Sequence, residues 1–320
     1  MRVSALTLLL VLVLPFTSIG AAPIAYSVNS DSPDANFADH LYSIDLATGV
    51  ATRIGEVRAL EPNINSDIEG LAFDTNGRLF GADDADETLL TLNLGSGQAT
   101  SVNGSTFNLQ LSQANYDFGL TFTCDGSLLM VADQPRSLFE VDDAIGQSTL
   151  RGVNGSLAAP ISGIAAFGDL VYGIGQGSDD GVTPLSPNLY LIDPVTGTAS
   201  LIGPLGNAVS PYRDAGLAFD SSGGLWAITD RRDINAQDLA SQVLSINTAT
   251  GEASLVSEIP VTDGAVGFES LAIAAPAGCS RPPNTFGVNP EGVPSLDQWA
   301  LLLLIMLLGG IGFRRLRQPT

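Results

Sequence analysis

Hydrophobic and polar residues alternate in five similar stretches of the chain. Each stretch holds two short alternating runs joined by a tight turn, with Gly at a fixed place in the turn. This pattern predicts β-hairpins, because the turn needs a positive φ that Gly adopts readily. The first residues of successive stretches lie 48 to 54 positions apart. The five stretches are 41–55, 89–103, 138–152, 189–203 and 243–257.

A second hairpin pattern lies between these stretches. It begins at Gly70, Gly119, Gly163 and Gly216, each time with an apolar run, a turn and a second run. One period therefore contains four antiparallel strands, which we call a, b, c and d. A period near 50 residues with four strands is typical of the blade of a β-propeller.

The two ends of this array complement each other. The chain starts with only b, c and d strands and finishes with a lone a-type strand at 269–274. Together they make one complete blade, so the ring closes and few strand edges stay open. We therefore expect an all-β protein, a five-bladed β-propeller of four-stranded antiparallel blades over residues 23–275.

The first 22 residues have the layout of a secretory signal peptide. Arg2 precedes an apolar run at 5–16, and small residues follow at 18–22. The apolar run is too short to span a membrane comfortably, so we expect cleavage at about residue 20 to 22.

The C-terminal end predicts a transmembrane helix. Residues 299–313 are apolar on every side, and Arg314, Arg315 and Arg317 follow at once. By the positive-inside rule the Arg-rich end stays in the cytoplasm, and the propeller faces outward. Residues 276–292 are rich in Pro and Gly and predict a linker to this membrane segment.

Residues 293–320 resemble the IPTL-CTERM sorting signal of Gram-negative envelope proteins. That signal has a short Ile-Pro-Thr-Leu motif, a Trp, an apolar span and a basic end. The matching positions here are Val293, Pro294, Ser295, Leu296 and Trp299, with Arg314, Arg315 and Arg317 as the basic end. The resemblance implies recognition by an exosortase-like membrane protease and display at, or release from, the cell surface.

Charge narrows the function classes. The formal net charge is −21, all 13 basic residues are Arg, and the one His is His40. Nucleic-acid binding is excluded, because it needs a basic face. A mechanism with a His base or a Lys nucleophile is disfavoured, because the sequence has one His and no Lys.

Carboxylates gather at one face of the expected ring. The start of strand a and the end of strand b lie at one mouth of the channel, and several acids stand there in equivalent positions of the repeats. Acids crowded at a narrow mouth repel each other, and a hard cation such as Ca²⁺ relieves the repulsion. The alternative is that they are solvated or accept hydrogen bonds from loop amides. The candidate ligands are Asp67, Glu69, Asp117, Asp214 and Glu269.

The fragment 67–84 resembles blade signatures of esterase-like phytase and lactonase propellers, in which an acid before the inner strand helps to bind metal. No complete catalytic set accompanies it, so the leading hypothesis is a non-catalytic binding or scaffold module with an extracellular ligand that the sequence does not name. The alternative is a Ca²⁺-dependent hydrolase working at the acidic mouth.

Two cysteines remain. Cys124 lies in an a–b turn, and Cys279 lies five residues past the closing strand, so both are expected on the face opposite the acidic mouth. An exported protein meets an oxidising compartment, where the two can pair. The sequence leaves open whether they do.

Overall fold

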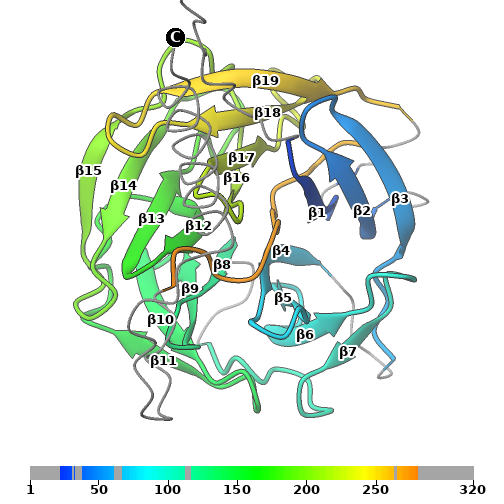
Figure 1. Ribbon diagram of the computed structural model, residues 1–320, viewed down its shortest axis with the longest axis vertical. Helices are drawn as coiled ribbons and strands as arrows, with labels where there is room; N and C mark the ends of the chain where they lie inside the picture. Colours follow the sequence, from blue (N-terminus) through cyan, green and yellow to red (C-terminus); the bar gives the residue numbers. More distant parts are fainter. Residues whose placement is uncertain are drawn as a thin grey trace, which may run out of the picture. The chain divides into compact units, whose positions relative to one another are not determined.

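The chain forms five antiparallel sheets arranged like blades round one axis (Figure 1). The computed structural model describes residues 22–30, 32, 38–60, 67–111, 117–262 and 265–279. Four sheets have four strands each and one has three, which confirms the predicted five-bladed all-β propeller. The predicted signal peptide and C-terminal helix lie outside the described residues.

The blades follow one another along the chain. Blade I consists of β1 (Ile24–Val28), β2 (His40–Asp45) and β3 (Val50–Glu56). Blade II consists of β4 (Ile68–Phe73), β5 (Leu79–Asp83), β6 (Thr88–Leu92) and β7 (Ala99–Ser101). Blade III consists of β8 (Phe118–Phe122), β9 (Leu128–Ala132), β10 (Ser137–Val141) and β11 (Ser148–Arg151). Blade IV consists of β12 (Ile161–Phe167), β13 (Leu170–Gly175), β14 (Asn188–Ile192) and β15 (Ala199–Pro204). Blade V consists of β16 (Ala215–Phe219), β17 (Leu225–Thr229), β18 (Ser241–Ile246) and β19 (Ala253–Ile259).

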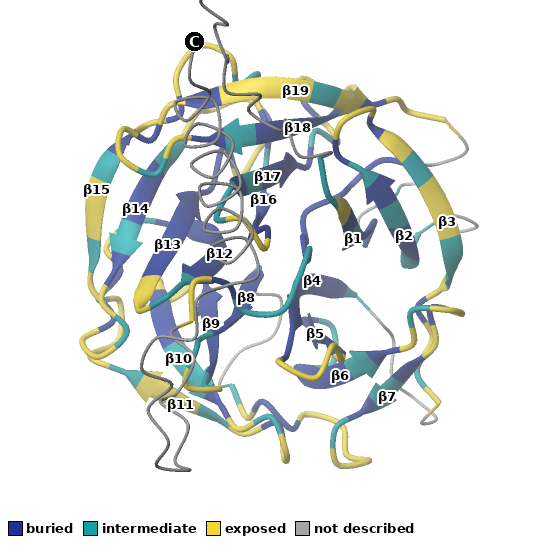
Figure 2. Cartoon of the chain, viewed as in Figure 1, coloured by how far each residue is buried: buried dark blue, intermediate teal, exposed yellow. Residues whose placement is uncertain are grey.

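Burial falls from the axis outward within each blade (Figure 2). Every residue of β4, β8 and β16 is buried, because both faces and both edges of an inner strand are covered. The outer strands β3 and β15 are largely exposed. This gradient explains why the a-type stretches are almost wholly apolar, whereas the d-type stretches mix apolar with polar residues.

The hydrophobic core is divided among the spaces between blades. Five clusters of buried side chains are found among the described residues, each drawn from two neighbouring blades. Aromatic rings cross these spaces: Phe80 of blade II packs on Phe122 of blade III, with ring centres 5.2 Å apart. Because strand side chains alternate between two faces, each blade contributes to the cluster on either side. Side-chain packing thus links every blade to both neighbours.

The inner strands approach each other closely at equivalent glycines. A Cβ added at Gly163 of β12 would lie 2.3 Å from the carbonyl oxygen of Ala215 on β16. At Gly119 it would lie 2.8 Å from the Cα of Gly163, and at Gly216 it would lie 2.5 Å from the backbone of Ser270. No side chain fits there without moving backbone, so these glycines set how tightly the ring closes.

The sequence predicts a full a strand at 269–274 that closes the ring. In the structure the closing segment forms fewer backbone hydrogen bonds than such a strand would. Within that segment only Ala272 forms a bridge, to Tyr26 of β1, with two backbone hydrogen bonds of 2.7 and 2.9 Å. Ser270 supplements them: its hydroxyl accepts from the Val28 amide at 3.0 Å, and its carbonyl accepts from the Ser27 hydroxyl at 2.5 Å. Serine stands here at the position that is glycine in the other four blades, and its side chain replaces a regular ladder bond.

Beyond the closing contact the chain continues to a disulfide. The Gly168 amide donates to the Ala277 carbonyl at 2.9 Å, which attaches the segment to the β12–β13 turn. Cys279 is then joined to Cys124 in the β8–β9 turn, with Cα atoms 5.2 Å apart. The bond links residues 155 positions apart. It therefore ties the exit of the chain to blade III, although the closing segment pairs with blade I.

The close approach of the inner strands predicts the effect of a single methyl group. Gly163→Ala places a Cβ against the Ala215 carbonyl and should lower the free energy of unfolding by about 3 kcal/mol. Gly95→Ala is the matched control, since its nearest neighbour would be the Asn93 side chain at 3.4 Å. Urea unfolding of both variants measures the difference, and equal stabilities would contradict tight packing at the axis.

The disulfide predicts a stability that depends on redox state. Cross-linking a loop of this length reduces the entropy of the unfolded chain, so reduction should cost about 5 kcal/mol. Urea midpoints with and without a reductant measure the cost. The Cys124→Ser/Cys279→Ser variant should start from the lower midpoint and not respond to reductant. A reductant effect in that variant would show that the loss has another cause.

Candidate functional site

The acidic mouth is built from the starts of the inner strands. Asp67 and Glu69 precede or begin β4, Asp117 precedes β8, Asp214 precedes β16, and Glu269 precedes the closing bridge. A β-bulge in β4, between Ile68 and Gly70, sets Glu69 outside the regular alternation of the strand. Bulges re-aim side chains. Glu69 directly precedes the glycine of its blade, Gly70, whereas Asp117 stands two residues before Gly119. Despite this offset, Glu69 lies close enough to Asp117 for their charges to interact.

A second set of acids, at the ends of the b strands, holds the turns together. Asp83 Oδ1 accepts from the amides of Asp67 and Ala85 at 3.2 and 3.1 Å. Asp133 Oδ1 accepts in the same way from Asp117 and Gln134. Asn29 and Asp230 likewise accept from the His40 and Arg232 amides. For these residues the interpretation as acceptors of loop amides holds.

Three of the five candidate ligands are almost fully buried. Glu69 and Asp214 are each 6% exposed and Glu269 is 4% exposed, whereas Asp117 and Asp67 are half-buried. Burial raises the pKa of Glu69 well above its ordinary value, and the charges of Glu269 and Asp117 raise it further. Burial likewise raises the pKa of Asp214, with Asp117 and Asp230 adding to the effect. The structure therefore brings these acids close enough to repel each other.

The acids at the mouth differ in their hydrogen bonds. Glu269 Oε1 accepts from the Ser30 hydroxyl. Asp117 Oδ2 accepts from Gln176 Nε2 at 3.3 Å, across from blade III to blade IV. Asp214 Oδ1 is buried and has no hydrogen-bond partner. A buried carboxylate oxygen without a donor is costly, which agrees with the raised pKa of Asp214; the nearby Arg213 charge lowers that pKa and offsets part of the effect.

Three carboxylates at the mouth lie close together. Asp67, Glu69 and Asp84 each offer an oxygen, and these oxygens lie within 4.8 Å of one another. Two oxygens bound to one Ca²⁺ at about 2.4 Å lie at most about 4.8 Å apart, so the three oxygens meet a condition that sharing one ion requires. Asp84 was not among the predicted ligands. The sequence feature that could have identified Asp84 is the pair of consecutive acids Asp83 and Asp84. Asp83 accepts hydrogen bonds from the turn, so Asp84 is the acid of the pair that can face the mouth.

The predicted ligands thus fall into two neighbouring groups. Asp67 and Glu69 join Asp84, and Glu269 interacts electrostatically with Glu69. Asp214 interacts with Asp117, Asp230 and Asp133. Asp117 interacts with both Glu69 and Asp214 and so connects the groups.

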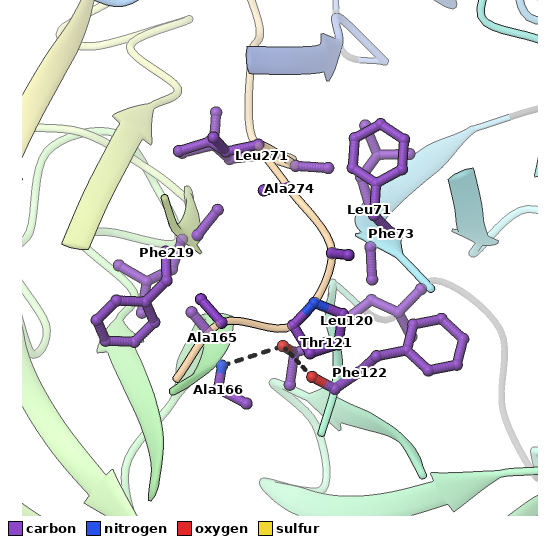
Figure 3. A pocket seen from close by; sticks show the side chains of 18 residues that line it. Leu71, Phe73, Leu120, Thr121, Phe122, Ala165, Ala166, Phe219, Leu271 and Ala274 are labelled. Atoms are coloured by element: carbon purple, nitrogen blue, oxygen red, sulfur yellow. Dashed lines mark hydrogen bonds between the residues drawn. The ribbon is translucent and has the colours of Figure 1, made fainter. Parts of the chain in front are cut away.

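The other end of the channel is apolar and nearly filled. The cavity there has a volume of only about 30 Å³. Figure 3 shows Leu71, Leu120, Phe122 and Phe219 round it, with Ala274 of the chain's exit segment among them. Thr121 is its polar side chain, and the Thr121 hydroxyl accepts from the Ala166 amide at 3.1 Å. The carboxylates that line the axis therefore lie at one end.

Comparison with protein families identifies the C-terminal motif. Residues 292–318 match the model of the IPTL-CTERM motif, which confirms the resemblance seen at 293–320. The motif is a C-terminal sorting signal and indicates an exported, envelope or cell-surface protein of a bacterium, associated with the membrane through its C-terminus. No curated protein sequence matches the chain. The described residues include no helix long and apolar enough to cross a membrane, and the predicted span lies outside them.

Solved structures with a loosely similar fold include three from bacteria. A protein of unknown function from Bacteroides thetaiotaomicron is 16% identical, covers 59% of this chain and has a TM-score of 0.41; this chain spans 50% of its length. A calcium-binding protein, regucalcin, from Agrobacterium tumefaciens is 17% identical over 74% of this chain and 71% of its own, with a TM-score of 0.40. A gluconolactonase from Xanthomonas campestris is 14% identical over 80% and 84%, with a TM-score of 0.42. No function is carried over from these proteins.

The buried acids predict a pH dependence in the presence of a chelator. The folded-state pKa values of Glu69 and Asp214 are raised, so the folded protein binds more protons than the unfolded chain above pH 4.5. Stability is then fully present below the ordinary values of 4.5 and 3.8 and is lost as pH rises. We expect Tm to fall by about 5 °C between pH 5 and pH 7.5.

Glu69→Gln should reduce this fall, because the amide carries no charge at any pH. Glu252→Gln, at an exposed carboxylate of the β18–β19 turn, should leave it unchanged. Turn acids that accept hydrogen bonds, such as Asp125 and Asp193, have lowered pKa values. The stability that they contribute is lost only as the pH falls below about 3.8, outside the range of this experiment. A Tm that rises between pH 5 and pH 7.5 would contradict the burial of charged acids at the mouth.

Proposed function

We propose that the protein is an exported binding module, displayed on the bacterial envelope, whose acidic mouth holds a divalent cation. The observation that carries the cation is the grouping of oxygens from Asp67, Glu69 and Asp84 within 4.8 Å of one another. Carboxylate oxygens are the ligands of hard cations, and Ca²⁺ accepts the irregular geometry of such a site more readily than Mg²⁺ does.

The unpartnered Asp214 Oδ1 supports the same proposal from the second group of acids. A positive charge at the mouth compensates carboxylates that burial and mutual repulsion destabilise. Three carboxylates supply only part of the six to eight ligands that Ca²⁺ takes, so positions on the ion remain for Glu269, water or an external ligand.

The display function rests on the sorting motif at 292–318. In this proposal a signal peptide at residues 1–22 exports the chain across the inner membrane of a Gram-negative bacterium. A helix formed by residues 293–313 then holds it in the membrane, and an exosortase-like protease processes the tail. The propeller faces the periplasm or the cell surface, where it meets its ligand.

Binding is favoured over hydrolysis by the composition of the chain. The sequence has no Lys, and its one His is His40. His40 stands at the start of β2, and its Nδ1 lies 2.7 Å from the Ala38 carbonyl oxygen. That contact gives His40 a local structural role, so the acid–base chemistry of an imidazole is not what the mouth offers.

Calorimetry with Ca²⁺ tests the cation site. We expect the metal-free protein to bind Ca²⁺ at pH 7.5 and to gain about 2.7 kcal/mol of stability at a hundredfold excess over Kd. Glu69→Gln/Asp84→Asn should abolish both effects. It should also be more stable than the wild type without metal, because a buried amide is neutral at every pH and folding no longer requires a proton on Glu69.

The matched control is Glu252→Gln, which should bind Ca²⁺ as the wild type does. If the double variant retains the binding heat, the ion is held elsewhere. If the wild type shows neither binding heat nor a Tm shift with Ca²⁺ or Mg²⁺, the cation proposal is wrong.

A further inference from the structure

A pocket lies between the loops of blades IV and V on the same face as the acidic mouth. It has a volume of about 390 Å³. Its walls come from three loops that leave or enter strands on this face: the β13–β14 loop, the β15–β16 loop and the β17–β18 loop. It is distinct from the group formed by Asp67, Glu69 and Asp84, which belongs to blade II.

The walls of this pocket are held in place by backbone contacts. The Gly177 amide donates to the Arg213 carbonyl at 2.7 Å, and the Asn235 amide donates to the Gly181 carbonyl at 3.2 Å. A Cβ at Gly177 would lie 2.3 Å from the Tyr212 carbonyl oxygen. The Tyr212 hydroxyl is buried and donates to the Gly175 carbonyl at 2.6 Å. The pocket is therefore formed before any ligand arrives, which lowers the entropy cost of binding.

The lining of the pocket is uncharged, in contrast to the mouth beside it. Among the residues that the structure describes, no Asp, Glu or Arg lines it. Its lining contains prolines and valines, among them Pro187, Val182 and Val209, and the polar residues Asn188, Asn207 and Asn235. The Asn188 side-chain amide also donates to the Tyr190 hydroxyl at 3.2 Å. Amides both donate and accept hydrogen bonds. Such a lining suits an uncharged ligand with an apolar face and a hydroxylated or amide-bearing edge.

Size narrows the ligand further. An apolar cavity of about 150 Å³ holds benzene, so 390 Å³ holds roughly 15 non-hydrogen atoms. A single N-acetylated hexose has about that size. It carries no charge, it has C–H faces for the prolines and valines, and its hydroxyl and acetamido groups suit the asparagine amides. We propose that the pocket binds one uncharged sugar unit of the N-acetylhexosamine type.

The position of the pocket extends the binding role proposed above, on which this assignment rests. Gly177 follows Gln176, whose side chain donates to Asp117 at the mouth, and Tyr212 stands two residues before Asp214. The pocket thus adjoins the group of acids that contains Asp117 and Asp214. A glycan with one sugar in the pocket can extend its next unit toward the acidic mouth.

Titration with a defined sugar tests the assignment. The probe is methyl N-acetyl-β-D-glucosaminide, followed by amide NMR on the purified full chain, once with chelator and once with Ca²⁺. We expect saturable shifts at the amides of Gly177, Val182 and Asn235 in both conditions. Shifts confined to other blades, or none at millimolar probe, would overturn the proposal.

Two variants locate the binding. Val182→Trp fills the pocket from an exposed position, since Val182 is 63% exposed, and should weaken binding at least about tenfold. Asn235→Gly removes one amide and keeps the left-handed backbone that Asn235 adopts, with φ 53°, and should weaken binding several-fold. Val195→Trp, at a 72% exposed valine in the β14–β15 turn, is the matched control and should bind as the wild type does.

Benzene tests the alternative that the pocket binds apolar molecules only. If benzene shifts the pocket amides and the sugar does not, the pocket is a purely apolar site and the sugar assignment is wrong. Because the sugar titration is also run with chelator, its failure is separable from that of the cation. Sugar binding without any Ca²⁺ binding would leave this proposal standing and overturn the cation site alone.

Discussion

The close approach of the inner strands is the constraint on which the rest of the structure depends. At Gly163, Gly119 and Gly216 the neighbouring backbone lies where a Cβ would be, so the five blades meet at a tight axis. The cores between blades and the apolar filling of the far end follow from that tightness. So does the crowding of acids at the other end, because residues that begin the inner strands must share a narrow ring. Their repulsion is the cost of placing carboxylates there, and the proposed cation would offset it.

The ring closes where the segment at 269–274 meets blade I, and we call this contact the seam. Blade I lacks an inner strand of its own, and the closing segment contributes one bridge with two backbone bonds, aided by Ser270. The chain then continues to the disulfide between Cys279 and Cys124. Because the sorting motif at 292–318 follows this point, a pull on the C-terminal tail is transmitted to blade III before it reaches the seam.

Much of the fold could be predicted from the sequence, because each blade repeats the same local pattern of strands and turns. Five blades and ring closure followed from the hairpins and from the matching deficit and surplus at the ends. The narrow closing bridge could not be predicted, since Ser270 differs from the glycines at its equivalents and takes over a backbone role. The bulge at Glu69 was not predicted, because strand register is set by pairing with the neighbouring strand. Asp84 was not predicted as a ligand either, because the sequence does not show that Asp83 caps the turn. The neutral pocket lay beyond sequence reasoning, because its loops do not repeat and come from two blades.

The central claim is that buried, mutually repelling carboxylates at the mouth are neutralised by protons when no cation is bound and by a cation when one is. Its most direct test is the number of protons released when Ca²⁺ binds, measured by titration calorimetry at pH 7 in buffers of different ionisation enthalpy. We predict net proton release, because Ca²⁺ favours the ionised form of carboxyl groups such as Glu69 and Asp214, whose pKa values burial raises. Release should disappear at pH values above those at which these acids titrate. Binding of Ca²⁺ at pH 7 without any proton release would contradict the account.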